Sequence, residues 1–288
     1  MKYYILYNPN AAIGKCDKKA EQLLSRYKNE GYLINMTEIS NYDDFFSNVN
    51  FDDKVIICGG DGTINHFVND TENVEINHDI YYYPAGSGND FYKDIGGADQ
   101  DGFVKINDYI TDLPSVYVND KKQLFVNGVG YGVDGYCCKE VNRIRNLRKK
   151  ANYALIALKG LLYAYKPTNA TVKVDGKEYK YTKVWLASSM LGKYFGGGIK
   201  IAPMQDRKNR KNGISLIIAH SLGTFDIIRL FLSIFKGTHI KHKKFVVVHE
   251  GNDISVEFDR PTVMQIDGEV RENVTKYQVV TEKVDAFV

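Results

Sequence analysis

Cysteine is scarce in this 288-residue sequence, and the positions of the few cysteines suggest neither covalent nor metal cross-linking. The four are Cys16, Cys58, Cys137 and Cys138, and none forms a CxxC pair. A disulfide framework or a zinc site is therefore not indicated. Cys58 ends an apolar run, where a buried and reduced thiol is the usual state, so we expect a cytoplasmic protein.

Long apolar runs are also missing. The most apolar stretch of the second part, residues 225–235, is 11 residues long and contains Asp226 and Arg229. A membrane-spanning helix needs roughly 20 apolar residues, so this stretch is not expected to cross a bilayer. Residues 1–9 lead from a single lysine directly into a short strand-like run and lack the features of a signal peptide. We therefore expect the mature chain to begin here.

The net charge is small, +3, but it is unevenly distributed. Residues 1–112 contain nine Lys and Arg against 19 Asp and Glu, whereas residues 113–288 contain 29 against 16. The difference is −10 for the first part and +13 for the second. This asymmetry suggests that the second part meets an anionic partner, either a lipid surface or a nucleic acid.

The first third of the chain alternates short strand-like runs with helical patterns. Strands are expected at residues 3–7, 33–39, 55–58 and 80–83, and helices at residues 16–27, at 43–49 and from residue 64 onward. This alternation predicts an α/β domain over residues 1–112, with a mainly parallel sheet covered by helices.

After about residue 113 the pattern changes to strands joined by turns. Strands are expected at residues 116–118, 123–129, 171–174, 179–188, 214–219, 244–248, 254–258 and 262–266. Helical segments near residues 136–165 and 224–235 interrupt them. This succession predicts a second, mainly antiparallel β-sandwich domain over residues 113–275.

The strongest local motif is the sequence GGDGT at residues 59–63, which directly follows the expected strand 55–58 and precedes a helix. Glycines let the backbone approach a ligand, and the amides at a helix N-terminus attract phosphate oxygens. Asp61 would repel phosphate unless it holds a cation or acts on a substrate proton. The motif therefore indicates nucleotide binding, and an ordinary βα turn capped by Asp61 is the alternative.

A second glycine-rich turn, PAGSGND at residues 84–90, follows the next expected strand. Because successive parallel strands end at the same sheet edge, we expect both turns to face one cleft at the carboxyl edge, where open α/β folds bind ligands. The alternative is an ordinary helix entry capped by Ser87 or Asn89.

Two further glycine motifs fit no standard phosphate loop. Residues 10–15 stop short of a P-loop, because Pro9 stands in place of its first glycine and Cys16 in place of its Ser or Thr. Residues 130–135 match GxGxxG but lie among the expected β-strands. We interpret them as tight packing or a turn that lines a cleft.

Four motifs together resemble one family. Asn8-Pro9-Asn10, residues 59–63, residues 84–90 and Asp267-Gly268-Glu269 occur in the order and spacing of the diacylglycerol kinase catalytic-domain family, which includes bacterial soluble diacylglycerol kinases, YegS-like lipid kinases and sphingosine kinases. The resemblance implies an NAD-kinase-like α/β nucleotide domain, completed by about residues 276–288, and a β-sandwich domain. It also implies a cleft between the two domains for ATP, Mg²⁺ and lipid.

The resemblance further implies roles for individual residues. Asp61 would act through Mg²⁺ or on the acceptor hydroxyl, and either Glu269 or Asp267 would be the general base. Without the family, residues 267–269 suggest a type I′ hairpin turn between two strands. The ATP contacts implied by the motifs are Asn8, Pro9, Asn10, Ala11, Ala12, Thr37, Gly59, Gly60, Asp61, Gly62, Thr63, Ile64, Asn65 and Ser87.

The sequence departs from the family in two places. His66 stands where the family often has Glu, and residues 212–215 lack both carboxylates of a structural Mg²⁺ site that many bacterial members have. A hard divalent cation without local anionic ligands binds weakly. The remaining candidate ligands are Asn209, Asn212 and the Ile214 carbonyl, with Asp206 as a substitute.

Basic clusters in the second part suit an anionic lipid surface. They lie within residues 143–150, 207–211 and 236–244, and each charge near such a surface contributes about 1 kcal/mol. Any one cluster also fits a solvated loop. Residues 225–235 are expected to cover a lipid pocket, to touch a bilayer or to pack on the sandwich. No RNA- or DNA-reading motif accompanies the clusters, so we expect no nucleic-acid partner.

The leading hypothesis is a cytoplasmic, peripherally membrane-associated lipid kinase that transfers the γ-phosphoryl group of ATP to diacylglycerol or a related lipid. One alternative is a kinase of NAD or another soluble acceptor, against which Asn8-Pro9 and residues 267–269 argue. Another is an inactive nucleotide-binding regulator, for which His66 and the missing metal carboxylates are the hints. A homodimer suits the fold class, but no residue specifies one.

Overall fold

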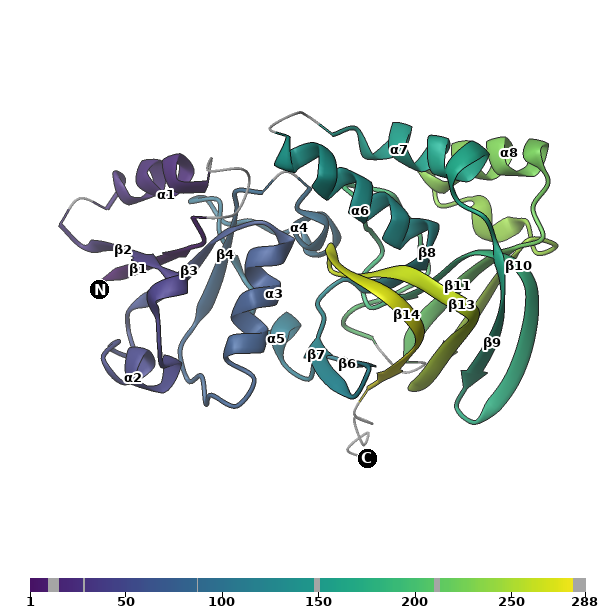
Figure 1. Cartoon of the computed structure of the whole chain (residues 1–288). Coiled ribbons are helices and arrows are strands. Elements are labelled where there is room, and N and C mark those ends of the chain that lie inside the picture. Colours follow the sequence, from purple (N-terminus) through teal and green to yellow (C-terminus); the bar gives the residue numbers. More distant parts are fainter. Residues whose placement is uncertain (10–15, 28, 87, 148–150, 210–212, 282–288) are drawn as a thin grey trace. The chain divides into compact units, whose positions relative to one another are not determined.

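The chain folds into two units, residues 1–111 and residues 112–288 (Figure 1). The computed structural model describes residues 1–9, 16–27, 29–86, 88–147, 151–209 and 213–281. None of the helices in these ranges is long and apolar enough to cross a membrane.

The first unit is built on a five-stranded sheet with the order β2-β1-β3-β4-β5. Strands β1 to β4 are parallel, and β5 runs antiparallel to β4. The strands are β1 Tyr3–Tyr7, β2 Gly31–Asn35, β3 Lys54–Gly59, β4 Ile80–Pro84 and β5 Val104–Lys105. This α/β architecture confirms the expectation from the alternating sequence pattern.

Helices cover this sheet and bury its central strand. They are α1 Cys16–Leu24, the 3₁₀ turn η2 Met36–Glu38, α2 Tyr42–Ser47, α3 Asp61–Asp70, α4 Asp90–Ile95 and α5 Asn107–Ile110. Residues 55–58 of β3 are fully buried, as a parallel strand is when helices cover both faces of its sheet. Helix α3 buries Ile64, Phe67 and Val68, at the i, i+3 and i+4 spacing of an amphipathic helix.

The carboxyl ends of the four parallel strands lie in one row. Tyr7 pairs with Asn35 on one side and with Cys58 on the other, and Cys58 pairs with Tyr83. The segments that follow these residues therefore leave the sheet at one edge. This register confirms that the two glycine-rich turns share an edge.

The second unit is built on a nine-stranded antiparallel sheet, sandwich-like in form. Its strand order is β12-β11-β10-β8-β13-β14-β6-β7, and β9 pairs with both β10 and β13. The strands are β6 Ser115–Val118, β7 Lys121–Leu124, β8 Gly128–Gly132, β9 Thr168–Val174, β10 Lys177–Met190, β11 Ile214–His220, β12 Val246–Gly251, β13 Asp253–Ile266 and β14 Glu269–Val280. The expected antiparallel β domain is thus confirmed.

Helices of the second unit form a layer with its main apolar cluster. They are α6 Val133–Asn146, α7 Tyr153–Lys159, the π-helix η3 Gly160–Ala164, α8 Thr224–Ile234 and the 3₁₀ turn η4 His239–Lys241. The cluster joins residues of α6, α7 and α8 to residues of β10, β11 and β12. Helix α8 confirms the expected helix near residues 224–235, whereas the helical segment near residues 136–165 is divided into α6, α7 and η3. Asn152 begins α7 by accepting the Leu155 N–H.

Three expectations for strands differ from the structure for physical reasons. The expected strand 33–39 ends at Asn35, because residues 36–38 form the 3₁₀ turn η2, whose Thr37 N–H donates to the Asn35 side chain. Residues 123–129 are not one strand, because β7 ends at Leu124 and the amides of Val126 and Asn127 bond to a side chain instead of a strand. Residues 254–258 and 262–266 belong to the single strand β13, which continues past Pro261 with a shift in register. Proline cannot donate to a sheet ladder, and a bulge accommodates it.

The expected return of residues 276–288 to the first unit is wrong for residues 276–280. They belong to β14, which pairs with β13 and β6 inside the second unit. Residues 282–288 lie outside the described residues. Because β14 is hydrogen-bonded to a strand of the second sheet on each side, residues 276–280 are not part of the first sheet.

Phe258 offers a test of the second core. Its ring is buried and stacks on Tyr131 with centroids 3.9 Å apart. Phe258→Ala should lower the unfolding free energy by about 3–5 kcal/mol, because it leaves a cavity. The control Tyr117→Ala, at a partly exposed position of β6, should cost less than about 1 kcal/mol. Trp185, the single tryptophan, lies in this unit, so its fluorescence during urea unfolding measures the unfolding free energy of both variants. An equal loss of unfolding free energy in the two variants would contradict the assignment of Phe258 to the core.

Candidate functional site

The turn at residues 59–63 joins β3 to α3, and Gly59 in it is required by space. A Cβ on Gly59 would lie 2.2 Å from the Thr63 hydroxyl oxygen, so no larger residue fits there. Gly62 is exposed, and a Cβ on it would meet no heavy atom within 4 Å. The space beside Gly62 at the beginning of α3 is therefore open to a ligand, and a helix N-terminus attracts phosphate oxygens.

The two glycine-rich turns touch each other through their backbones. The amides of Ala85 and Gly86 both donate to the Gly59 carbonyl, at 2.7 and 3.0 Å. A Cβ on Gly86 would lie 2.4 Å from the Gly60 Cα. Such a close backbone approach requires glycine, because any side chain would collide. The two turns are therefore in direct contact and form one site.

The side chain of Asp61 also joins the two turns. Its two carboxylate oxygens accept the backbone N–H groups of Asp90, at 3.0 Å, and Phe91, at 2.8 Å. Asp61 is the first residue of α3, and its carboxylate thus caps the N-terminus of the later helix α4. The sequence indicated the carboxylate but not this bond to the second turn.

Other expected nucleotide contacts divide into three groups. Asn8 and Pro9 follow β1, and Thr37 lies exposed in η2 after β2, so all three are at the edge where the turns lie. Ile64 and Asn65 are buried in α3, so their side chains serve the core. The expected contacts outside the described residues are Asn10, Ala11, Ala12 and Ser87.

This edge fits a phosphate-bearing ligand. It combines the open N-terminus of α3 with the flexible cation Lys19, whose ammonium group donates to the Ala85 carbonyl at 3.0 Å. Among the described residues, no group of three or more His, Cys, Asp and Glu could hold a metal ion alone. Mg²⁺ that arrives with nucleotide phosphates needs only one or two protein carboxylates, and Asp61 offers one.

A second carboxylate site lies at the turn between β13 and β14. Ile266 pairs with Glu269, and the two residues between them have positive φ, 46° for Asp267 and 93° for Gly268. This is the backbone of a type I′ hairpin. The hairpin alternative is therefore correct as local structure, and it presents two carboxylates on one tight turn.

Asp267 and Glu269 differ in what they bind. Asp267 accepts the backbone N–H groups of Val126, Asn127 and Gly128, at 2.5, 2.8 and 2.9 Å. Glu269 instead accepts side-chain donors, Arg271 at 3.0 Å and Gln123 at 3.5 Å, and its side chain is one-third exposed. Asp267 therefore holds a backbone loop, whereas Glu269 is bound by side chains.

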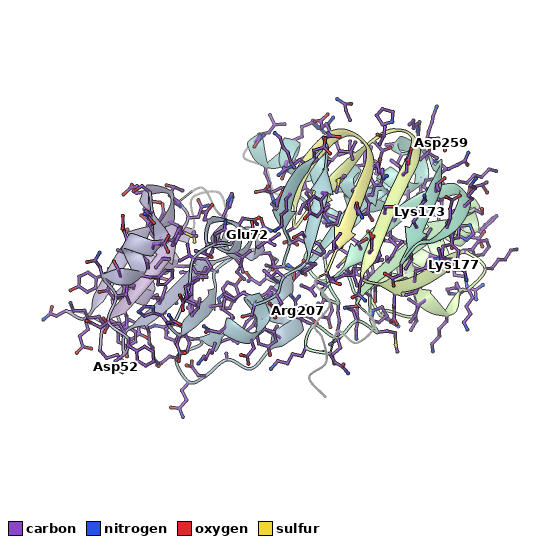
Figure 2. The ribbon with its side chains drawn as sticks, turned by 90° about the horizontal axis from the view of Figure 1, so that it is seen from below. Asp52, Glu72, Lys173, Lys177, Arg207 and Asp259 are labelled. Atoms are coloured by element: carbon purple, nitrogen blue, oxygen red, sulfur yellow. The ribbon has the colours of Figure 1, made fainter. Side chains whose placement is uncertain are left out.

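Arg207 secures that loop from the other side. It is buried, and its guanidinium donates to the Val126 carbonyl and, at 3.0 Å, to the Asn127 side chain. Residues 126 and 127 are thus held between a cation and the Asp267 carboxylate. Figure 2 shows Arg207 apart from Lys173 and Lys177, which point outward. The sequence placed Arg207 in a basic surface cluster, which is wrong, since no pattern distinguishes a buried arginine from its exposed neighbours.

In the described part of the segment considered for a structural metal, the polar side chains bind other groups of the chain. Gln205 is buried and bonds to the Ser215 hydroxyl and to the Gly213 carbonyl. Asp206 accepts the backbone amides of Lys208 and Asn209. Ile214 lies in β11, and Asn212 is outside the described residues. The side chains of Gln205 and Asp206 thus bind groups of the chain itself, and a metal site at Asn209, Asn212 and Ile214 stays a prediction.

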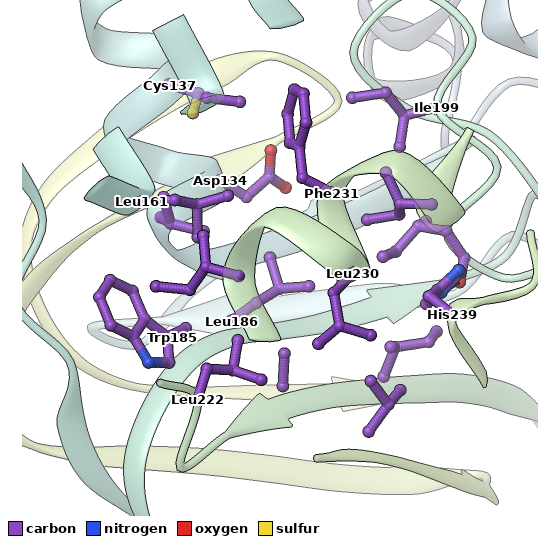
Figure 3. A pocket seen from close by; sticks show the side chains of 18 of the residues that line it. Asp134, Cys137, Leu161, Trp185, Leu186, Ile199, Leu222, Leu230, Phe231 and His239 are labelled. Atoms are coloured by element: carbon purple, nitrogen blue, oxygen red, sulfur yellow. Dashed lines mark hydrogen bonds between the residues drawn. The ribbon is translucent and has the colours of Figure 1, made fainter. Parts of the chain in front are cut away.

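An apolar cavity of about 80 Å³ lies among the helices and strands of the second unit (Figure 3). Helices α6, α7, η3 and α8 line it together with β10 and β11. Burial shifts the pKa of two of its lining residues to values between about 4 and 6. Burial raises the pKa of the Asp134 carboxyl to about 6, although hydrogen bonds to Tyr153 and Gln265 act in the opposite direction. Burial also lowers the pKa of His239 to about 4.

A chain of hydrogen bonds connects this cavity with the carboxylate turn. The Tyr153 hydroxyl and, at 3.0 Å, the Gln265 amide donate to the two oxygens of Asp134. The side-chain oxygen of Gln265 accepts the Gly268 N–H at 2.6 Å. The wall of the pocket and the turn that presents Glu269 are therefore parts of one polar network.

The GxGxxG motif at residues 130–135 serves this network by packing. A Cβ on Gly130 would lie 1.6 Å from an Asp134 oxygen, and one on Gly135 would lie 2.2 Å from the Val263 carbonyl oxygen. Gly132 has φ 98°. The glycines make room for a buried carboxylate, which confirms the packing interpretation.

Comparison with known proteins shows which families the two units resemble. The family model described as the diacylglycerol kinase catalytic domain matches residues 2–110, and that of the YegS C-terminal NAD kinase beta sandwich-like domain matches residues 127–285. The chain is 24% identical over 275 residues to the diacylglycerol kinase of Bacillus subtilis (strain 168), covering 92% of this chain and 88% of that protein. It is 26% identical over 258 residues to the diacylglycerol kinase of Mycobacterium tuberculosis (strain CDC 1551 / Oshkosh), covering 83% and 80%.

A solved structure shares the fold. The crystal structure of a diacylglycerol kinase from Bacillus anthracis str. Sterne matches with a TM-score of 0.59 at 16% identity, covering 97% of this chain and 94% of that one.

The contact between the two glycine-rich turns can be tested by one methyl group. Gly86→Ala places a Cβ against the Gly60 backbone, so it should lower the unfolding free energy by about 1–3 kcal/mol. Gly62→Ala, which has open space, is the matched control and should be neutral or slightly stabilising. Thermal unfolding followed by circular dichroism measures both. Equal stability of Gly86→Ala and the wild type would show that the turns are not in contact.

The buried carboxyl should make stability depend on pH. Because the folded pKa of Asp134 is raised to about 6, the folded chain binds its proton more tightly than the unfolded chain. The stability that protonated Asp134 contributes is therefore fully present below about pH 4, and it is lost as the pH rises through about 6. The unfolding free energy of the wild type, minus that of Asp134→Asn, should therefore increase by up to about 3 kcal/mol from pH 7 to pH 4.

Urea titrations of both proteins at several pH values measure this difference. His239 titrates in both proteins, so its effect cancels. A difference that does not change with pH would mean that Asp134 is not buried as an acid.

Proposed function

The chain belongs to the diacylglycerol kinase catalytic-domain family, and from this premise we propose that it is an ATP-dependent kinase of diacylglycerol or a related lipid. The proposal is supported most directly by the apolar pocket of the second unit, which is linked through Asp134 and Gln265 to the turn that presents Glu269. The lining of this cavity is predominantly apolar, which suits acyl chains better than a dinucleotide such as NAD.

The first unit would supply the nucleotide site. The N-terminus of α3 and the open space beside Gly62 suit the phosphates of ATP. When bound with the nucleotide, Mg²⁺ would neutralise charge on those phosphates, and Asp61 is the residue that would hold it. Asp61 also keeps the second turn in place through the amides of Asp90 and Phe91.

Glu269 is the general base in this proposal. It would accept the proton of the lipid hydroxyl while that oxygen bonds to the γ-phosphorus and the bond to the bridging oxygen of ADP breaks. Arg271 and Gln123, which bind Glu269, would orient its carboxylate. Asp267 is a positioning residue, since three backbone amides already occupy it.

We also propose that the protein acts in the cytoplasm, at the surface of a membrane. The charge of +13 on residues 113–288 favours peripheral contact with an anionic membrane, and the four cysteines are free thiols, as is usual in the cytoplasm. Phosphorylation of such a lipid would belong to phospholipid metabolism.

Phosphate transfer in mixed micelles tests the proposal. Radiolabelled ATP with Mg²⁺ is offered diacylglycerol, monoacylglycerol, ceramide, sphingosine and undecaprenol, with NAD as the soluble acceptor. Wild-type protein should label a lipid, and Glu269→Gln should lower the rate by about 10²–10⁴-fold, because it removes the base. Glu272→Gln, an exposed carboxylate on the same strand that pairs with Lys139, should keep the wild-type rate.

Two results would count against this function, and a third against the proposed base. Labelled NAD with unlabelled lipids would favour the soluble acceptor. ATP binding without labelling of any acceptor would reject phosphoryl transfer to these acceptors, and an unchanged rate in Glu269→Gln would reject Glu269 as the base. Asp267→Ala should lose both rate and stability, which distinguishes a positioning residue from a base that costs only rate.

A further inference from the structure

Helix α8 has two apolar faces. Its inward face, with Ile227 and Leu230 buried, lines the cavity. Its outward face carries Phe225, Ile228, Leu232 and Phe235, of which Phe225 is 89% and Leu232 is 67% exposed. These four positions follow a spacing of three, four and three residues and therefore form one stripe along the helix. A helix that is apolar on both faces is normally buried, and this one is not.

The neighbouring helices extend the stripe into a surface. Helix α8 packs against η3, and the two line the same cavity as α7. Tyr163 of η3 is 83% exposed and Leu155 of α7 is 65% exposed. Figure 1 shows α7 and α8 on the same side of the second unit. We call the exposed side chains of Leu155, Tyr163, Phe225, Ile228, Leu232 and Phe235 the apolar surface.

The charges in and beside this surface are basic. Helices α7, η3 and α8 contain one acidic residue, Asp226, which caps its own helix by accepting the Gly223 N–H at 3.1 Å. Lys159 and Arg229 lie on these helices, Lys236 is the second residue after the end of α8, and all three are exposed. Apolar side chains with basic residues at their edge match the boundary between acyl chains and anionic headgroups.

Charge also argues against a second copy of this chain as the occupant. Two copies joined through the same surface would bring two units of +13 together, and like charges across an interface are unfavourable. A membrane with anionic lipids attracts the same charge.

We propose that the apolar surface of α7, η3 and α8 is the membrane-docking surface of the protein and inserts into the headgroup region of anionic bilayers. This inference deepens the proposed function and rests on it for the identity of the substrate. The inward face of α8, including Phe231 (Figure 3), lines the cavity whose outer cover is the docking surface. An acyl chain would then pass from the bilayer to the pocket between these helices without crossing water.

Sedimentation with vesicles, in the absence of ATP and diacylglycerol, tests the surface separately from catalysis. Wild-type protein is mixed with vesicles of phosphatidylcholine that contain phosphatidylglycerol, and with pure phosphatidylcholine vesicles. The variant Phe225→Ser/Leu232→Ser should bind the anionic vesicles about tenfold or more weakly. The matched control Phe51→Ser removes an equally exposed aromatic ring, 77% exposed, from the first unit, and should bind like the wild type.

The outcomes separate the two proposals. Equal vesicle binding of the double variant and wild type, with unchanged Trp185 fluorescence in both, would overturn the docking surface. So would a wild-type dimer in solution that the double variant breaks while vesicle binding persists, since the surface would then join copies of the chain. Vesicle binding that depends on Phe225 and Leu232, without phosphate transfer to any lipid, would leave the docking surface standing and reject the kinase function.

Discussion

In each unit the candidate site depends on one aspartate that accepts backbone N–H groups from a distant loop. Asp61 holds the amides of Asp90 and Phe91, and Asp267 holds those of residues 126–128. Such charge-assisted bonds are roughly twice as strong as neutral ones, and they fix backbone rather than flexible side chains. The turns that would meet the nucleotide, and the turn that presents Glu269, therefore have defined shapes before any ligand arrives, which lowers the entropic cost of positioning.

Much of this arrangement was predictable from the sequence, because it rests on local patterns. The alternation of strands and helices, the row of strand ends and the two glycine-rich turns follow from periodicity and from the preference of glycine for tight approach. The β14 pairing of residues 276–280, the continuity of β13 across Pro261 and the burial of Arg207 depend on tertiary contacts. No window of neighbouring residues contains that information. Asp134 illustrates the limit, since its GxGxxG context was visible while its partners, Tyr153 and Gln265, are distant in sequence.

The hydrogen-bond network around Asp134 contributes more to fixing the geometry of the carboxylate turn than to stability. A carboxyl in an apolar wall is unfavourable to bury, and its bonds offset that cost only in part, as the raised pKa of Asp134 shows. The benefit is geometric, because Gln265 uses one end of its amide for Asp134 and the other for Gly268. Packing at the cavity and the backbone of the hairpin turn are thereby coupled through two side chains.

The uneven charge has a consequence for the approach to a surface. With −10 on residues 1–112 and +13 on residues 113–288, the two units carry opposite net charge. Within a Debye length of an anionic surface, about 10 Å at 0.1 M salt, the second unit would be attracted and the first repelled. Added salt would weaken the attraction and the repulsion together, so ionic strength would reduce the difference between the two units in their affinity for such a surface.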